Sequence, residues 1–273
     1  MNRKWPFIGP EFEALARWYF GTAAVLLLLR FASNVLFSQM GNPVLAETGT
    51  DHLYIWLFKW GITKWCISGV FTPALLDILL FALLLVGALS PSWRWLSTLF
   101  FSTLLTIYMV AFNTYAGHHY HGLFFIILGS TPFWWRNAAS QQRAIAFVRY
   151  YFLFVFVSAC CWKFFRGALF QPDQMVNILR AQHAQSFLEG DWLASSRSWL
   201  LVHPALAQML LISGAAIQGF FVIGFFSRSW DRVLVFLAFL FALVNYWLMG
   251  IFMAEVLTGC LFLLYQPAGA GEE

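Results

Sequence analysis

Residues 144–167 read AIAFVRYYFLFVFVSACCWKFFRG, with Arg149 near the start of this hydrophobic stretch and Lys163 near its end. About 20 apolar residues are enough for an α-helix to cross the hydrocarbon core of a bilayer. A lysine at bilayer depth costs on the order of 3 kcal/mol, so it usually turns toward a protein partner or a water-filled cavity. The alternative is that Lys163 lies within one turn of the helix end and extends its ammonium to the membrane interface. The stretch therefore predicts a transmembrane helix whose lysine is either interfacial or functional.

The composition of the whole chain is that of a membrane protein. Of its 273 residues, 61% are hydrophobic and only 10% are charged, whereas globular domains carry about 25% charged residues. The net charge of +4 says little about acidic partners, because Lys and Arg in membrane proteins mainly set the orientation. We therefore expect a polytopic integral membrane protein whose main partner is the lipid bilayer and which binds no nucleic acid.

About eight apolar segments are expected to cross the bilayer and to form an all-α helical bundle. They are residues 14–37, 72–89, 95–112, 122–135, 144–167 and 204–226, together with two spans inside 233–265. As one helix, the last run would be about 50 Å long against a hydrocarbon thickness of about 30 Å. We therefore expect a break around Met249 and Gly250. The bundle is expected to be a single transmembrane domain over residues 1–273, with its membrane core at about 14–265.

Two longer segments between the spans are not expected to cross the bilayer. Residues 38–71 combine Trp with interspersed Lys, a pattern typical of a helix on the membrane surface or of a re-entrant segment. We expect this segment to lie at the outer interface. Residues 168–203 are the longest polar stretch, and we expect a loop with short helices outside the core.

The distribution of Lys and Arg predicts a cytoplasmic N-terminus. Eight spans then place on the inner side Arg3, Lys4, Arg94, Arg136, Arg143, Arg228 and Arg232. In this topology the costly polar groups of the spans gather in the outer half. They are Asp77, Asn113, His118, His119, His121, Lys163, Asn245 and Glu255, with Arg30 approaching them. We therefore expect a pocket that faces the periplasm or another extracytoplasmic compartment.

Three of the six histidines, His118, His119 and His121, stand together in AFNTYAGHHYHGLFF, just before the fourth span. Such a cluster fits a metal site, acid/base chemistry or a polar membrane interface. The cysteines have no CxxC and no Cys/His ligand spacing, so we expect neither zinc nor a redox motif. In the expected pocket, Lys163 can act as a general base, with imidazole or Glu255 assisting.

Three stretches resemble a known family. The fifth helix carries Arg149, Tyr150–Tyr151, Ser158–Ala159 and Lys163–Phe164, and it resembles the corresponding helix of vitamin K-dependent gamma-carboxylases and their bacterial relatives, the horizontally transferred transmembrane (HTTM) family. The segment GHHYHGL and the closing RVLVFLAFLFALVNYWLMGIFMAEV are similar to that family's histidine-bearing entry to the fourth span and to its last helix pair. The resemblance covers roughly residues 14–265 and is better from residue 113 onward.

The resemblance implies carboxylase or quinol-epoxidase chemistry with a reduced quinone, similar to vitamin K hydroquinone, as cofactor. A lysine at the place of Lys163 would deprotonate the hydroquinone, and a histidine at the place of His118 or His119 would stabilise oxyanionic charge. Oxygenation would then give a strong base that removes a glutamate γ-proton before CO2 adds. The sequence departs from the family because residues 165–170 read FRGALF, without the Trp that usually follows the lysine, and Leu243 replaces a histidine.

Two classes of function remain open. One is a membrane enzyme acting on a quinol or another lipid-soluble substrate, with Lys163, His118 and His119 as catalytic residues. Its substrate-binding residues would be His121, Asp77, Asn113, Asn245, Glu255 and Arg30. The other class is a non-enzymatic partner subunit or small-solute permease, although permeases often show internal repeats and no clear repeat is present. The sequence ends without the family's soluble domain, so a protein partner that supplies this domain is a further expectation.

Overall fold

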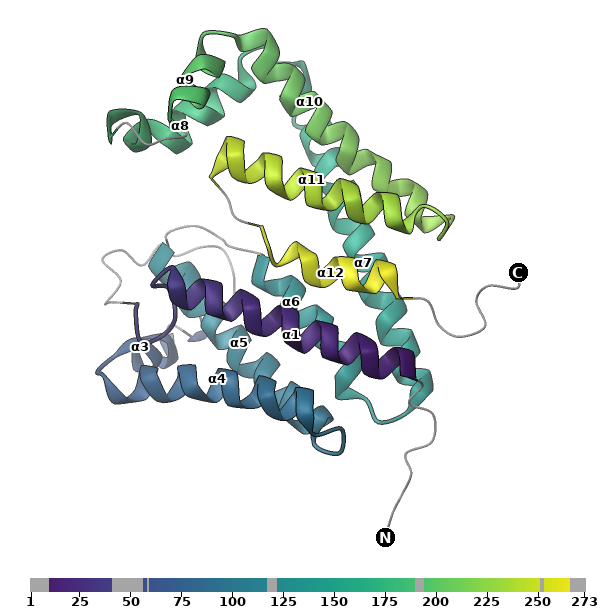
Figure 1. Ribbon diagram of the computed structural model, residues 1–273. Helices are drawn as coiled ribbons and strands as arrows, with labels where there is room; N and C mark the ends of the chain where they lie inside the picture. Colours follow the sequence, from purple (N-terminus) through teal and green to yellow (C-terminus); the bar gives the residue numbers. More distant parts are fainter. Residues whose placement is uncertain are drawn as a thin grey trace. The chain divides into compact units, whose positions relative to one another are not determined.

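The computed structural model describes residues 10–40, 56–57, 59–116, 122–189, 194–250 and 253–265. Within these ranges every regular element is a helix (Figure 1), which confirms the predicted all-α class. The α-helices are α1 (Pro10–Ala32), α3 (Ile62–Ile67), α4 (Phe71–Leu89), α5 (Arg94–Ala116), α6 (Gly122–Ser130), α7 (Ala138–Phe165), α8 (Gln174–Glu189), α9 (Ala194–Leu201), α10 (Pro204–Phe220), α11 (Asp231–Met249) and α12 (Val256–Leu264). The 3₁₀ helices are η1 (Thr131–Trp134), η2 (Ala168–Phe170) and η3 (Phe221–Phe225).

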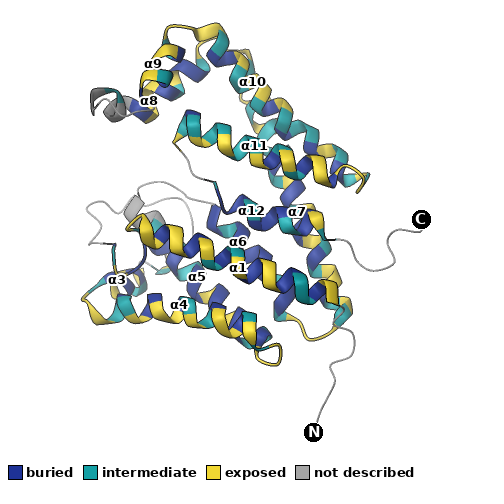
Figure 2. Ribbon diagram, in the orientation of Figure 1, coloured by how far each residue is buried: buried dark blue, intermediate teal, exposed yellow. Residues whose placement is uncertain are grey.

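Six of the described helices are long and apolar enough to cross a membrane. They are α1, α4, α5, α7, α10 with η3, and α11. Much of their apolar surface is not covered by protein: only 17% of the apolar window of α11 is buried, and Figure 2 shows exposed residues along α4, α10 and α11. Contiguous apolar surface of this kind is rare on soluble proteins. These helices indicate a multi-pass membrane protein.

The predicted count of about eight spans is not supported. The expected fourth span is divided into α6, of 9 residues, and η1, of 4 residues, and the expected last span is the 9-residue α12. A nine-residue α-helix is about 14 Å long, half of a hydrocarbon core of about 30 Å. Pro132 in η1 helps to end α6, because proline has no backbone N–H to continue the α-helical pattern.

The break predicted in residues 233–265 is confirmed. Helix α11 ends at Met249, and its C-cap Gly250 has a left-handed φ of 67°. Glycine adopts this conformation without the steric penalty of a Cβ, which is why it often ends helices. The short helices expected in residues 168–203 are η2, α8 and α9. In the surface segment expected at 38–71, the structure describes α3, and residues 41–55 and 58 lie outside the described ranges.

The chain divides into two compact units, which we describe separately. One unit comprises residues 1–148 and 257–273, and the other comprises residues 149–256. Helix α7 contributes its first part to the former and its remainder to the latter. The single transmembrane domain expected from the sequence stays a prediction.

In the first unit, α1 packs against α4 and α6 through aromatic side chains. The ring of Phe133 lies 5.1 Å from the ring of Tyr19 and 5.3 Å from that of Phe20. The Tyr19 hydroxyl donates a hydrogen bond of 2.7 Å to the carbonyl oxygen of Ile126 in α6. A Cβ on Gly87 of α4 would lie 2.6 Å from the Phe20 ring, so only glycine allows this close approach.

In the second unit, the helices α8 and α9 pack on α10 and α11. Their shared core consists of Met175, Val176, Leu179, Leu200, Ala207 and Leu248. Nearer the start of α11, a Cβ on Gly224 would lie 2.6 Å from a methyl group of Leu153 and 2.7 Å from one of Leu234. Helices α7 and α11 therefore come together across η3 at this glycine.

Candidate functional site

Arg149 and Lys163 lie on the same helix, α7, but residues of the second unit compensate their positive charges differently. The Arg149 side chain is buried, and its Nη2 and Nε donate to Oδ1 and Oδ2 of Asp231 at 2.8 and 3.2 Å. Nη2 also donates to the carbonyl oxygen of Gly224 at 2.8 Å. A buried arginine needs an opposite charge and hydrogen-bond acceptors, and Arg149 has both. We therefore assign Arg149 a structural role.

Lys163 has a neutral hydrogen-bond partner, the sole one among the described residues. Its Nζ donates a short hydrogen bond of 2.6 Å to Oε1 of Gln218 on α10. Gln218 is buried and Lys163 is half-buried. In the described ranges, no carboxylate lies within 4.0 Å of this ammonium, since the ion pairs there are Arg149–Asp231 and Arg94–Glu13. The positive charge of Lys163 is therefore available to a bound molecule.

The neighbours of Lys163 illustrate the interfacial alternative. At the end of α7, the Arg166 guanidinium lies 4.4 Å from the centre of the Trp162 ring, and Trp162 and Phe165 are largely exposed. Tryptophan with a cation is the usual arrangement at a membrane interface. The ammonium of Lys163 instead turns toward the buried amide of Gln218. This direction favours a lysine that serves a site within the protein.

A second glutamine on α10 lies near the segment that follows α7. Nε2 of Gln208 donates to the carbonyl oxygens of Ala168 and Leu169 at 3.1 and 3.0 Å. Its Oε1 is buried and accepts no hydrogen bond from the described residues. A buried acceptor without a donor costs about 1–3 kcal/mol. Water or a ligand hydroxyl would remove this cost.

Neither glutamine of α10 was predicted from the sequence as a site residue. A signal was present, because Gln208 and Gln218 are the two amide side chains of the apolar segment 204–226. Polar residues within a span usually face the bundle interior and mark functional positions. Both glutamines are uncharged, and the site residue predicted on α7, Lys163, was chosen for its charge.

Two predicted site residues, Arg30 and Asp77, have structural contacts in the first unit. Arg30 is buried, its Nη1 donates to the Tyr108 hydroxyl at 3.3 Å, and its guanidinium lies 4.8 Å from the centre of the Phe112 ring. The two carboxylate oxygens of Asp77 accept the backbone N–H groups of Phe37 and Ser38 at 3.0 and 2.9 Å. Asp77 thus holds the turn that follows α1.

The remaining predicted residues are described only in part. Nδ2 of Asn245 in α11 lies 3.2 Å from the sulfur of Met253, and Glu255 is buried immediately before α12. His118, His119 and His121 lie outside the described residues, as does the side chain of Asn113. The structure therefore joins Lys163 to Gln218, while a cavity shared with the histidines stays a prediction.

A further polar cluster, not predicted from the sequence, lies at the C-terminal end of α11 in the second unit. His183 Nε2 lies 2.8 Å from the carbonyl oxygen of Leu248, and Arg197 Nε donates to that of Trp247 at 3.0 Å. Arg197 Nη1 lies 3.4 Å from His183 Nδ1. Since arginine only donates, Nδ1 accepts and Nε2 carries the proton. Both side chains thereby satisfy carbonyl groups that a helix end leaves unpaired.

No protein-family model matches the chain, and neither a curated protein nor a solved structure matches it. The functional interpretation therefore rests on the residues and on their geometry. In that geometry, the lysine with a neutral partner is the strongest candidate for chemistry.

Proposed function

We propose that the protein is a membrane-embedded enzyme that acts on the acidic hydroxyl of a lipid-soluble substrate such as a quinol. One observation carries the proposal: within the 28-residue apolar helix α7, the half-buried ammonium of Lys163 has, among the residues that the structure describes, only the neutral amide of Gln218 as a partner. A phenolate or a similar oxyanion would supply the missing negative charge. An apolar substrate would reach this position from the bilayer.

In the proposed reaction, Lys163 in its neutral form accepts the hydroxyl proton of the substrate. The O–H bond breaks, its electron pair stays on the oxygen, and the proton binds the lone pair of Nζ. The resulting ammonium and phenolate stabilise each other, because opposite charges interact strongly where water is excluded. The hydrogen bond to Oε1 of Gln218 orients Nζ while the proton moves.

The proposal includes a relationship to the carboxylase-like HTTM family, with His118 or His119 near the substrate oxygen. It also includes a cytoplasmic N-terminus and an extracytoplasmic position for the Lys163 end of α7. Support comes from the arginines in the short connections before α5, α7 and α11 and in the first two turns of these helices, since cytoplasmic loops are enriched in positive charge. They are Arg94, Arg136, Arg143, Arg228 and Arg232.

Labelling of single cysteines tests this orientation. Cysteines introduced at Ser140 in the first turn of α7 and at Ser195 in α9 should react with a membrane-impermeant maleimide from opposite sides. The background must lack Cys161, which is exposed, and Cys160, which is half-buried. Reaction of both positions from the same side would contradict the proposed topology.

Substitution of Lys163 tests the chemistry. Lys163→Ala should abolish oxygen-dependent quinol oxidation in proteoliposomes, because the proposed base is removed. Lys163→Arg should also abolish it, because a guanidinium stays protonated and cannot accept a proton. Arg166→Ala is the matched control at the same helix end, where the guanidinium contacts the Trp162 ring, and it should retain turnover.

The two Lys163 variants distinguish chemistry from electrostatics. Turnover in the arginine variant alone would mean that Lys163 contributes only a positive charge. Turnover in a folded alanine variant would exclude a base at this position. The non-enzymatic subunit would then be the better interpretation. Size-exclusion profiles of the purified variants should match that of the unmodified protein, so that loss of folding is not taken for loss of chemistry.

A further inference from the structure

The turn that joins η3 to α11 in the second unit (Figure 1) carries two exposed arginines, Arg228 and Arg232. Within the part of the chain that the structure describes, neither guanidinium has a hydrogen-bond acceptor or a carboxylate partner. The proposed chemistry of Lys163 does not use this turn. Both positive charges are therefore available to a molecule outside the chain.

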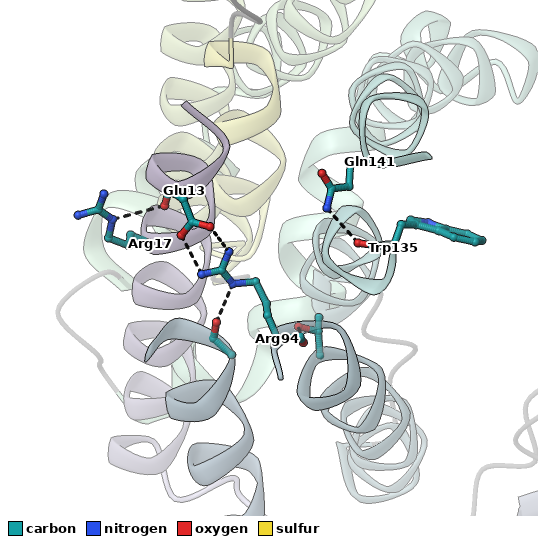
Figure 3. A network of polar contacts seen from close by, with 7 residues as sticks. Glu13, Arg17, Arg94, Trp135 and Gln141 are labelled. Atoms are coloured by element: carbon teal, nitrogen blue, oxygen red, sulfur yellow. Dashed lines mark hydrogen bonds and ion pairs between the residues drawn. The ribbon is translucent and has the colours of Figure 1, made fainter. Parts of the chain in front are cut away.

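Arginines near helix starts in the first unit are already engaged. Nη1 and Nη2 of the buried Arg94 donate to the two carboxylate oxygens of Glu13 at 2.8 and 2.9 Å (Figure 3). Nε of the exposed Arg17 donates to the backbone carbonyl oxygen of Glu13 at 3.4 Å (Figure 3). Arg228 and Arg232 differ from both, because the described residues offer their guanidinium groups no such acceptor.

The turn itself is held in place by Arg149. Nη2 of Arg149 donates to the carbonyl oxygen of Gly224 before the turn, and the same guanidinium pairs with Asp231 after it. Within the turn, the backbone N–H of Asp231 donates to the carbonyl oxygen of Arg228 at 3.1 Å. Arg228 and Arg232 therefore extend from a fixed backbone, which lowers the entropy lost when they bind a ligand.

Two serines flank Arg228 and add a hydrogen-bond donor. Oγ of Ser227 and Oγ of Ser229 lie 2.7 Å apart, and Oγ of Ser227 also accepts the backbone N–H of Ser229 at 3.2 Å. Two hydroxyl groups have two hydrogens, and their mutual bond uses one of them. The second hydroxyl hydrogen and the guanidinium N–H groups are donors that suit the oxygens of a phosphate.

We propose that Arg228 and Arg232 bind the phosphate of an anionic phospholipid headgroup. The apolar side chains of the same turn favour a lipid over a soluble anion, because Phe226 and Trp230 are exposed at 86% and 43%. A bound phosphate ion would leave both rings in water, whereas the glycerol region and acyl chains of a phospholipid cover them. Tryptophan beside arginine is also the usual composition where a helix meets the headgroups.

The charge of the turn distinguishes anionic from zwitterionic headgroups. The charged residues from η3 to the first turn of α11 are Arg228, Asp231 and Arg232. Asp231 is buried and neutralised by Arg149, so the two exposed arginines leave a net charge of +2. Basic residues beside a transmembrane helix attract anionic lipids. A zwitterionic headgroup carries its own cation, which the arginines repel.

Native mass spectrometry of the full chain in detergent tests this site. Phosphatidylglycerol should bind the unmodified protein more tightly than phosphatidylcholine. Arg228→Gln/Arg232→Gln should weaken phosphatidylglycerol binding about 30-fold, the factor for two cations at about 1 kcal/mol each. Each single variant should weaken it about fivefold. Both side chains are exposed, so these variants should keep the size-exclusion profile of the unmodified protein.

Arg17→Gln/Arg143→Gln is the matched control. It also removes two exposed arginines, and the proposed topology puts both near the same side of the membrane as the turn. The guanidinium group of each bonds to acceptors in its own helix. The control should therefore bind phosphatidylglycerol within twofold of the unmodified protein.

Three outcomes would overturn the proposal. Equal binding by Arg228→Gln/Arg232→Gln and the unmodified protein would remove both arginines from the site. Equal weakening by the two double variants would mean a diffuse effect of charge. Displacement of the lipid by inorganic phosphate at equal concentration would identify free phosphate as the ligand. Both double variants keep Lys163, so their quinol turnover can be measured separately and the two proposals fail independently.

Discussion

Replacement of Asp231 by alanine is expected to lower the free energy of unfolding by about 3–5 kcal/mol, the range for breaking a buried ion pair from one side. Asp231 accepts two hydrogen bonds from Arg149, and both side chains are almost completely buried. The alanine variant keeps the Arg149 charge but removes its carboxylate. Among the described residues, the carbonyl group of Gly224 would be the remaining hydrogen-bond acceptor of Arg149. Unfolding in a denaturing detergent, followed by circular dichroism, measures the loss.

The double variant Arg149→Met/Asp231→Leu is the matched control. It removes both charges while filling similar volumes, and such replacements of buried pairs are often neutral or stabilising. We expect it to be more stable than Asp231→Ala by at least about 2 kcal/mol, because no uncompensated charge remains. A double variant as unstable as Asp231→Ala would mean that packing, rather than charge, accounts for the loss.

Asp77→Ala is expected to cost about 2–4 kcal/mol, because the buried N–H of Phe37 without an acceptor costs about 1–3 kcal/mol and the partly exposed N–H of Ser38 costs less. The unpaired donors are the backbone N–H groups of Phe37 and Ser38, which now bind the two oxygens of Asp77. Limited proteolysis in the turn after α1 should increase together with the loss of stability. Asp77→Asn keeps one acceptor oxygen and should lose about half as much.

If Asp77 instead served only a bound substrate, both variants would fold as stably as the unmodified protein. Loss of substrate binding would then be the sole effect. The comparison thus separates the contacts that the structure describes from the substrate-binding role expected from the sequence.

Apolar length and charge were enough to predict the long helices. The glycine at position 250 also marked the end of α11, because a left-handed residue commonly ends a helix. The short length of the helices in the predicted fourth and eighth spans could not be recognised from apolar length and charge. Residues 122–135 carry no charged side chain, and hydropathy does not report where the α-helix changes to the 3₁₀ helix at Thr131.

For the candidate site, the sequence indicated the costly groups but not their partners. Lys163 stood out as an intramembrane cation, whereas Gln218, its hydrogen-bond partner, lies 55 residues further along the chain. Asp77 and Arg30 stood out equally, yet their contacts are with Phe37, Ser38 and Tyr108. The residue type indicates the free-energy cost of burying a charged group. Its hydrogen-bond partners, which offset this cost, depend on how distant segments pack together.

The pair between Arg149 and Asp231 also constrains the order of biogenesis. Its members are 82 residues apart, and ribosomes add about 5–20 residues per second. Arg149 is therefore synthesised about 4–16 s before its carboxylate. During that interval the nascent α7 contains an unmatched cation, which disfavours its release into lipid by about 3 kcal/mol. Helix α7 is thus expected to remain beside the insertion machinery until α11 emerges, so that the second unit enters the bilayer as one piece.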